Sequence, residues 1–104
     1  MSMQVLFNYA GVEHSTALED HVRQQIDHQF GRFSDRVTRV EVHITDENSH
    51  KHGSADKHCT LEARPAGMKP IAVESRAADF YAAVNDAAGK LGRALIHRFE
   101  RKAS

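Results

Sequence analysis

Hydrophobic and polar positions follow two different periods along this chain, and these periods separate the predicted strands from the predicted helices. Alternation with a period of two is clearest where Val40, Val42 and Ile44 face one way and polar residues face the other. Such alternation is typical of a half-buried strand. It occurs at residues 3–8, 37–45 and 57–64 and in the short stretch with Ile71 and Val73. The chain is therefore expected to form four strands.

Hydrophobic residues at three- and four-residue steps predict two amphipathic helices. The first begins at Ser15 or Thr16, where Thr16 followed by Glu19 fits a capping box, and it runs to about Phe33. The second begins after Asp79 as its N-cap and continues to the end of the basic segment. Their hydrophobic stripes are Leu18, Val22, Ile26, Phe30 and Phe33, and then Phe80, Val84, Ala88, Leu91, Leu95 and Phe99.

The predicted order of elements is β-α-β-β-β-α, which indicates an α+β fold. The first two strands are joined through a helix, so they should be parallel if they are neighbours, with a right-handed crossover. The later strands should form an antiparallel meander. We therefore expect a two-layer sandwich in which two helices cover one face of a four-stranded mixed sheet. A length of 104 residues suits one ordinary domain, expected over residues 1–104.

Charge is unevenly distributed, although 14 Lys and Arg balance 14 Asp and Glu. Residues 90–102 contain five Lys or Arg and one Glu, whereas residues 1–31 are net acidic. Lys90, Arg93, His97 and Arg101 share one face of the second helix, with Arg98 and Lys102 beside them. This row is longer than helix capping requires, and it suits a polyanion such as a nucleic-acid backbone.

Composition disfavours several other functional classes. No hydrophobic run approaches the ~20 residues that span a bilayer, and no signal-peptide region is evident, which favours a cytoplasmic protein without a membrane partner. The single Cys59 cannot form an internal disulfide, in keeping with a reducing compartment. No Gly-rich phosphate loop is present. We expect no catalysis, no cofactor and no small-molecule substrate.

Two alternatives to nucleic-acid binding remain open. His50, His52 and His58 lie near Cys59 in the sequence, and zinc or copper binds such donors. His58 and Cys59 have opposite parities on one predicted strand, so they should point apart, and a solvated histidine-rich loop is the simpler interpretation. The other alternative is a small interaction domain that binds an acidic protein through its basic helix.

Several motifs resemble those of the hibernation-promoting factor and ribosome-associated inhibitor family, the sigma-54 modulation proteins, in its short form. They are Met3-Gln4-Val5, Val12-Glu13-x-Ser15-x-Ala17-Leu18, Asp79-Phe80-Tyr81-Ala82-Ala83-Val84 and Lys90-Leu91-x-Arg93-x-Leu95. The resemblance implies a fold similar to double-stranded-RNA-binding domains. It also implies binding to the small ribosomal subunit and its rRNA in the messenger and transfer RNA channel, where idle ribosomes are inactivated or preserved under stress.

The resemblance further implies which residues contact RNA. On the second helix they are Lys90, Arg93, His97, Arg98, Arg101 and Lys102, and on or just after the first helix they are Arg23, Arg32 and Arg36. The first helix departs from the family, because Glu19, Asp20 and Asp27 dominate where several Lys and Arg are usual. The C-terminal dimerisation domain of long family members is also missing, so pairing of ribosomes through such a domain is not expected.

Overall fold

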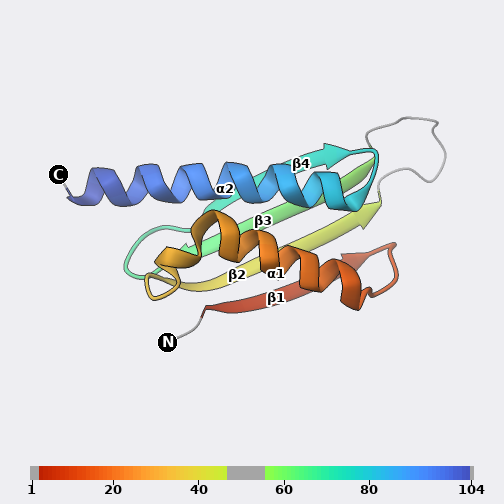
Figure 1. Cartoon of the computed structure of the whole chain (residues 1–104), viewed down its shortest axis with the longest axis horizontal. Coiled ribbons are helices and arrows are strands. Elements are labelled where there is room, and N and C mark those ends of the chain that lie inside the picture. The colour runs from red at the N-terminus through yellow and green to blue at the C-terminus, as the bar shows by residue number, and fades with distance from the viewer. Residues whose placement is uncertain (1–2, 47–55, 104) are drawn as a thin grey trace.

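The computed structural model describes residues 3–46 and 56–103, with side chains as far as Arg101, and shows two helices on one face of a four-stranded sheet (Figure 1). The elements are β1 (Gln4–Ala10), α1 (Thr16–Phe30), the 3-10 helix η1 (Gly31–Phe33), β2 (Val37–Asp46), β3 (Lys57–Pro65), β4 (Ile71–Ala77) and α2 (Phe80–Ala103). The predicted α+β order β-α-β-β-β-α is confirmed.

The sheet has the strand order β1-β2-β3-β4. β1 and β2 pair in parallel, with Val5 opposite Val40 and Phe7 opposite Val42. This direction follows from the connection, because α1 carries the chain back along the sheet before β2 begins. β2, β3 and β4 follow one another as an antiparallel meander. Both predicted pairings are confirmed.

One hydrophobic core lies between the helices and the sheet. Val40 and Val42 of β2 and Leu61 of β3 point toward the helices, and each is fully buried. Val22 of α1 and Leu91 of α2 meet them from the other side and are equally buried. Each such side chain contributes about 1.5–3 kcal/mol relative to the exposed state. Burial of these alternating positions fixes which sheet face the helices cover.

The cap of α1 differs from the prediction. Ser15 is the N-cap, and its side-chain oxygen accepts a hydrogen bond from the backbone N–H of Leu18 at 3.1 Å. Glu19 therefore lies one position beyond the one that closes a capping box. Its carboxylate instead accepts a hydrogen bond from the Tyr9 hydroxyl at 2.8 Å. The predicted Thr16–Glu19 box is wrong because the helix starts at Thr16 rather than after it.

The other helix boundaries agree more closely with the sequence. Asp79 caps α2 as predicted, since its Oδ1 accepts from the backbone N–H of Ala82 at 2.8 Å. α1 ends at Phe30, three residues earlier than expected, because the chain tightens into η1 at that point. Phe33 nevertheless packs into the stripe, with its ring 4.9 Å from that of Phe99. No helix within residues 3–46 and 56–103 is long and apolar enough to cross a membrane.

Candidate nucleic-acid interface

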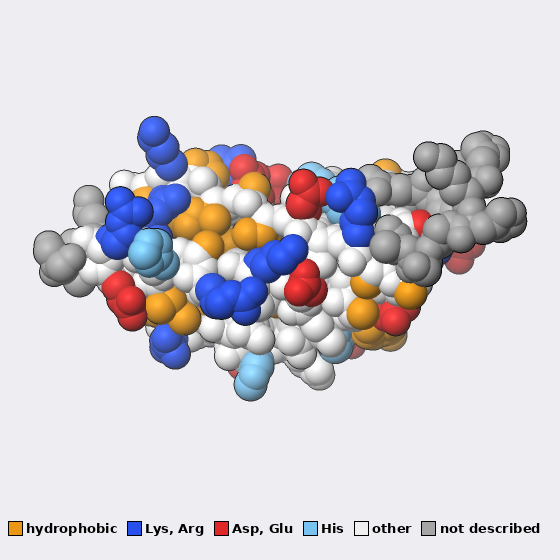
Figure 2. Space-filling model, turned by 90° about the horizontal axis from the view of Figure 1, so that it is seen from above, with side chains coloured by type: hydrophobic (Ala, Val, Ile, Leu, Met, Phe, Trp, Pro, Cys, Tyr) orange, Lys and Arg blue, Asp and Glu red, His pale blue; other side chains and the backbone are white. Residues whose placement is uncertain are grey.

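The basic side chains of α2 lie outside the stripe that the helix buries in the core. Leu91, Leu95 and Phe99 are buried, while Arg93 and Arg101 are exposed at the intervening positions. This separation follows from the amphipathic pattern of the helix. Figure 2 views this side of the molecule and shows Lys and Arg side chains gathered along it, with fewer acidic side chains between them. The cations of α2 whose side chains the structure describes therefore lie along one side of the molecule, with other side chains between them.

Lys90 differs from the other cations because its ammonium group is held within the fold. Its Nζ donates to the backbone carbonyl of Glu74 at 2.9 Å and lies 3.1 Å from the Asp86 carboxylate. Asp86 also accepts from the Ser75 hydroxyl at 2.6 Å. The hydrogen bonds from Ser75 and then from Lys90 lower the pKa of Asp86. Lys90 thus ties α2 to β4, and part of its charge is already neutralised.

A shallow groove at the basic end of α2 gathers cations from two elements. Arg98 Nη1 donates to the backbone carbonyl of Lys69 at 3.1 Å, which holds the β3–β4 turn against the helix. The groove has a volume of about 440 Å³ and is lined by Gly67, Met68, Lys69, Arg98 and Arg101. Gly67 has φ +72°, which a side chain would oppose, so the turn needs glycine here. Three cationic residues thus surround one hollow.

Two further arginines reach the same end of α2 through an aromatic pair. Arg36 lies over the Phe99 ring at 3.9 Å, and Arg32 lies over the Phe33 ring at 4.9 Å. The two rings are themselves in contact. Stacking on aromatic faces orients a guanidinium group without removing its charge. The structure therefore brings the predicted residues Arg32 and Arg36 next to the basic end of α2.

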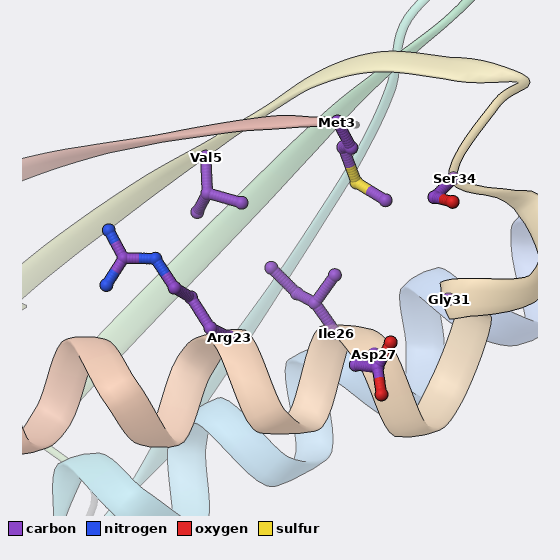
Figure 3. Close-up of a pocket in the computed structure, with 7 residues that line it drawn as sticks. All are labelled: Met3, Val5, Arg23, Ile26, Asp27, Gly31 and Ser34. Atoms are coloured by element: carbon purple, nitrogen blue, oxygen red, sulfur yellow. The ribbon is translucent and has the colours of Figure 1, made fainter. Parts of the chain in front are cut away.

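Arg23 lies apart from this cluster. It projects from α1 toward β1, on the side of α1 away from α2, and its guanidinium lies 5.0 Å from the centre of the Phe7 ring (Figure 3). The carboxylates of Glu19 and Asp20 are 4.0 and 3.9 Å away. The environment of Arg23 is therefore close to neutral, and the structure does not join this residue to the cations of α2.

Of the remaining candidate residues, the structure describes the side chains of His97 and His58. His97 is exposed on α2 between Arg93 and Arg101, whereas the Lys102 side chain lies outside the described part of the structure. His50 and His52 also lie outside the described residues. His58 is on the open sheet face, where its Nε2 is 2.7 Å from Glu74 Oε1.

The geometry around His58 bears on the metal hypothesis. Cys59 is fully buried on the opposite face of the same strand, so the two side chains point apart as predicted. His58 already faces the Glu74 carboxylate. Among the residues that the structure describes, no group of three or more His, Cys, Asp or Glu side chains is arranged to hold a metal ion.

The open sheet face offers a different chemistry from that of α2. Glu41 lies 3.0 Å from Arg39 on the same strand and 3.7 Å from Arg64 on the neighbouring strand, so opposite charges are paired along β2 and across to β3. The outward positions of the described strands hold no Phe, Tyr or Trp on which bases could stack. The helix side is therefore the better candidate for the surface that binds a polyanion.

The fold and this surface define a small two-layer α+β domain with a cationic helix on one side. A model of the sigma 54 modulation protein / S30EA ribosomal protein family matches residues 5–103. The chain belongs to this family, as its motifs indicated. No curated protein sequence gives a significant match.

Solved structures show the same fold. One is a ribosomal subunit interface protein from Coxiella burnetii, with a TM-score of 0.75 and 19% identity over 98% of this chain and 100% of that one. Another is the N-terminal domain of Protein Y from Thermus thermophilus, with a TM-score of 0.71 and 22% identity over 95% of this chain and 99% of that one. The predicted fold class is confirmed by both.

Proposed function

We propose that this protein is a single ribosome-associated domain that binds rRNA of the small subunit and holds idle ribosomes inactive or intact. The observation that carries the proposal is the groove where Lys69, Arg98 and Arg101 meet, with Arg36 held nearby on Phe99. Membership in a family described as S30EA ribosomal protein supports a ribosomal partner, as does the name of the Coxiella burnetii protein. Such a factor acts in the cytoplasm and catalyses no reaction.

The proposed contact is electrostatic. Lys and Arg side chains neutralise phosphates and release condensed counterions, so the affinity should fall steeply as salt is added. The guanidinium groups of Arg98 and Arg101 can offer paired N–H donors to phosphate oxygens, while Lys69 acts as a point charge. Contacts of this kind recognise the shape of folded RNA rather than its bases. The messenger and transfer RNA channel, a folded rRNA surface, suits that mode.

The acidic residues of α1 determine from which side RNA should approach the protein. Asp20 and Asp27 are exposed on α1, whereas Arg93 and Arg101 are exposed on α2. RNA phosphates should be repelled by the first pair and attracted by the second. We therefore expect the RNA to contact α2, the β3–β4 turn and the segment after α1, and we expect Arg23, on the side of α1 away from α2, to take no part.

Co-sedimentation with isolated ribosomal subunits tests this proposal. A variant with Arg93→Glu, Arg98→Glu and Arg101→Glu should no longer pellet with the small subunit at low salt. A matched control reverses Arg39, Arg64 and Arg76 on the open sheet face, which changes the net charge equally, and should pellet like the wild type. Circular dichroism shows whether both variants are folded.

The outcomes separate the alternatives. Retained pelleting of the α2 variant would remove this surface from the mechanism. Binding to an acidic protein but not to subunits or protein-free rRNA would replace the RNA proposal with a protein partner. Equal loss in both variants would indicate that the added negative charge repels the subunit, without a role for the proposed surface.

A further inference from the structure

The two edges of the sheet are protected to different degrees. β4 follows Pro70, carries Glu74 and Arg76, and has one backbone carbonyl bound by Lys90 Nζ at 2.9 Å. β1 reads Gln-Val-Leu-Phe-Asn-Tyr-Ala, without a charge or a proline, and pairs with β2 without a bulge along its whole length. Charges, proline and bulges are the usual means of preventing a further strand from pairing with an edge. The described strand β1 has no charged residue, no proline and no bulge.

β1 also leaves hydrophobic surface uncovered on both faces of the sheet. Leu6 is 42% exposed on the outer face. On the helix face a groove of about 400 Å³ separates β1 from α1, with Met3, Val5 and Ile26 lining it (Figure 3). A strand added beside β1 would direct alternate side chains toward these two surfaces. Pairing would therefore bury hydrophobic area as well as backbone hydrogen-bonding groups.

The charges at the rim of this groove are self-complementary. Arg23 and Asp27 are four residues apart on α1, and Figure 3 shows Arg23 toward the Val5 side and Asp27 toward the Met3 side. In an antiparallel pair of two β1 strands centred on Val5, Met3 of each copy lies opposite Phe7 of the other. Because Arg23 lies over Phe7, it would then meet Asp27 of the second copy. A two-fold axis repeats this contact, as in isologous interfaces.

We propose that the occupant of this edge is a second copy of the chain, joined by antiparallel β1–β1 pairing about a two-fold axis near Val5. The hydrophobic strand pairs with itself without charge repulsion, and the Arg23–Asp27 contacts select the register. β1 and α2 lie on opposite sides of the molecule (Figure 1), so the basic surface of each copy stays open in the dimer. The inference is independent of the proposed ribosomal function.

Sedimentation velocity over a range of protein concentrations tests the dimer. The wild type should shift from monomer to dimer as its concentration rises. Leu6→Lys places a charge on the exposed edge strand and should keep the protein monomeric. The matched control Ala72→Lys places the same charge at an exposed position of β4 and should dimerise like the wild type. A wild type that stays monomeric at millimolar concentration, or equal effects of the two lysines, would overturn the proposal.

Exchanging the charges of Arg23 and Asp27 tests the register of the β1–β1 pairing. Two single variants are compared with the double variant, so the test does not depend on how well any one variant folds. Arg23→Asp alone and Asp27→Arg alone should each weaken dimerisation roughly tenfold, because like charges then face each other at two places. The double variant exchanges both charges and should restore the wild-type dissociation constant. Additive weakening in the double variant would rule out the Val5-centred pairing.

Discussion

The single cysteine shows how position in the core sets the chemistry of a side chain. Cys59 lies opposite Ile44 on β2 and Ser75 on β4, and it is fully buried. Burial raises the pKa of its thiol to about 12. The thiolate is the reactive form, so this cysteine should be inert in the folded protein. Its role is that of a small hydrophobic residue.

The same shift predicts a dependence of stability on pH. At pH values well below 9.0 the thiol is protonated in both the folded and the unfolded chain. As the pH rises from there toward about 12, only the unfolded chain loses the proton, so the free energy of unfolding falls. The slope of this contribution is at most about 1.4 kcal/mol per pH unit. Urea unfolding should show a flatter alkaline profile for Cys59→Ala than for the wild type.

An unchanged alkaline slope in Cys59→Ala would contradict this assignment. Tyr9 provides the internal reference, because burial and then its hydrogen bond to Glu19 also raise its pKa. Its contribution has the same sign and remains in the variant. Only the difference between the two profiles therefore reports on Cys59.

Individual residues of the candidate site were predictable to different degrees. The helical spacing of Arg93 and Arg101 placed them on one exposed face, because their periodicity is local. Lys69 has no such signal, since it joins the groove only when the β3–β4 turn packs against Arg98. Arg23 and Arg36 look alike in the sequence, yet one lies over Phe7 and the other over Phe99. That difference depends on tertiary packing, which spacing does not encode.

At the scale of elements, the contact between α1 and α2 depends on one glycine. A Cβ at position 92 would lie 3.2 Å from the Cβ of Gln29 and 3.3 Å from its carbonyl oxygen. A Cβ at position 89 would meet only Arg93 Nη1 at 3.4 Å, the end of a flexible side chain. Only Gly92 is therefore required for the close approach of the helices.

Alanine at these two positions should have opposite effects on stability. Gly92→Ala should lower the free energy of unfolding by about 1–3 kcal/mol, because it overpacks the helix contact. Gly89→Ala should raise it by up to about 1 kcal/mol, because alanine favours the helix without a clash. Thermal and urea unfolding of the two variants give the comparison. Effects of the same sign would show that the contact with Gln29 adapts freely.

The link between β4 and α2 gives a prediction in the acid range. Ser75 is 6% exposed and donates to Asp86, whose lowered pKa favours the folded state above the pKa of the unfolded chain. This contribution is lost as the pH falls through the folded pKa. Ser75→Ala should cost about 1 kcal/mol at neutral pH and make the acid loss smaller. Identical acid profiles of variant and wild type would exclude this hydrogen bond as the cause.

The sequence predicted the elements better than their ends. Alternation at Val40, Val42 and Ile44 identified β2 because burial on one face imposes that period. The cap of α1 was misplaced because Ser15 and Thr16 are both good caps, and the choice depends on the local backbone. Glu19 was assigned to a capping box, but β1 brings Tyr9 to it, a contact between residues ten positions apart.

At the scale of the whole molecule, the neutral net charge conceals two separate surfaces. The basic surface runs along α2 and the β3–β4 turn, while exposed acidic residues mark α1. In the proposed function, this separation would let a protein with a formal net charge of zero bind a polyanion in one orientation. The uncharged β1 edge lies on the side opposite α2, so RNA binding and self-association would use different surfaces.

The most direct test of the central claim is the salt dependence of binding to isolated small ribosomal subunits. The logarithm of the association constant should fall linearly with the logarithm of the salt concentration, with a slope set by the number of phosphates contacted. Arg98→Ala and Arg101→Ala should each weaken binding and reduce the slope by about one, whereas Arg76→Ala on the open sheet face should leave the slope unchanged. Binding that is independent of salt, or slopes that are equal in all the variants, would contradict the account.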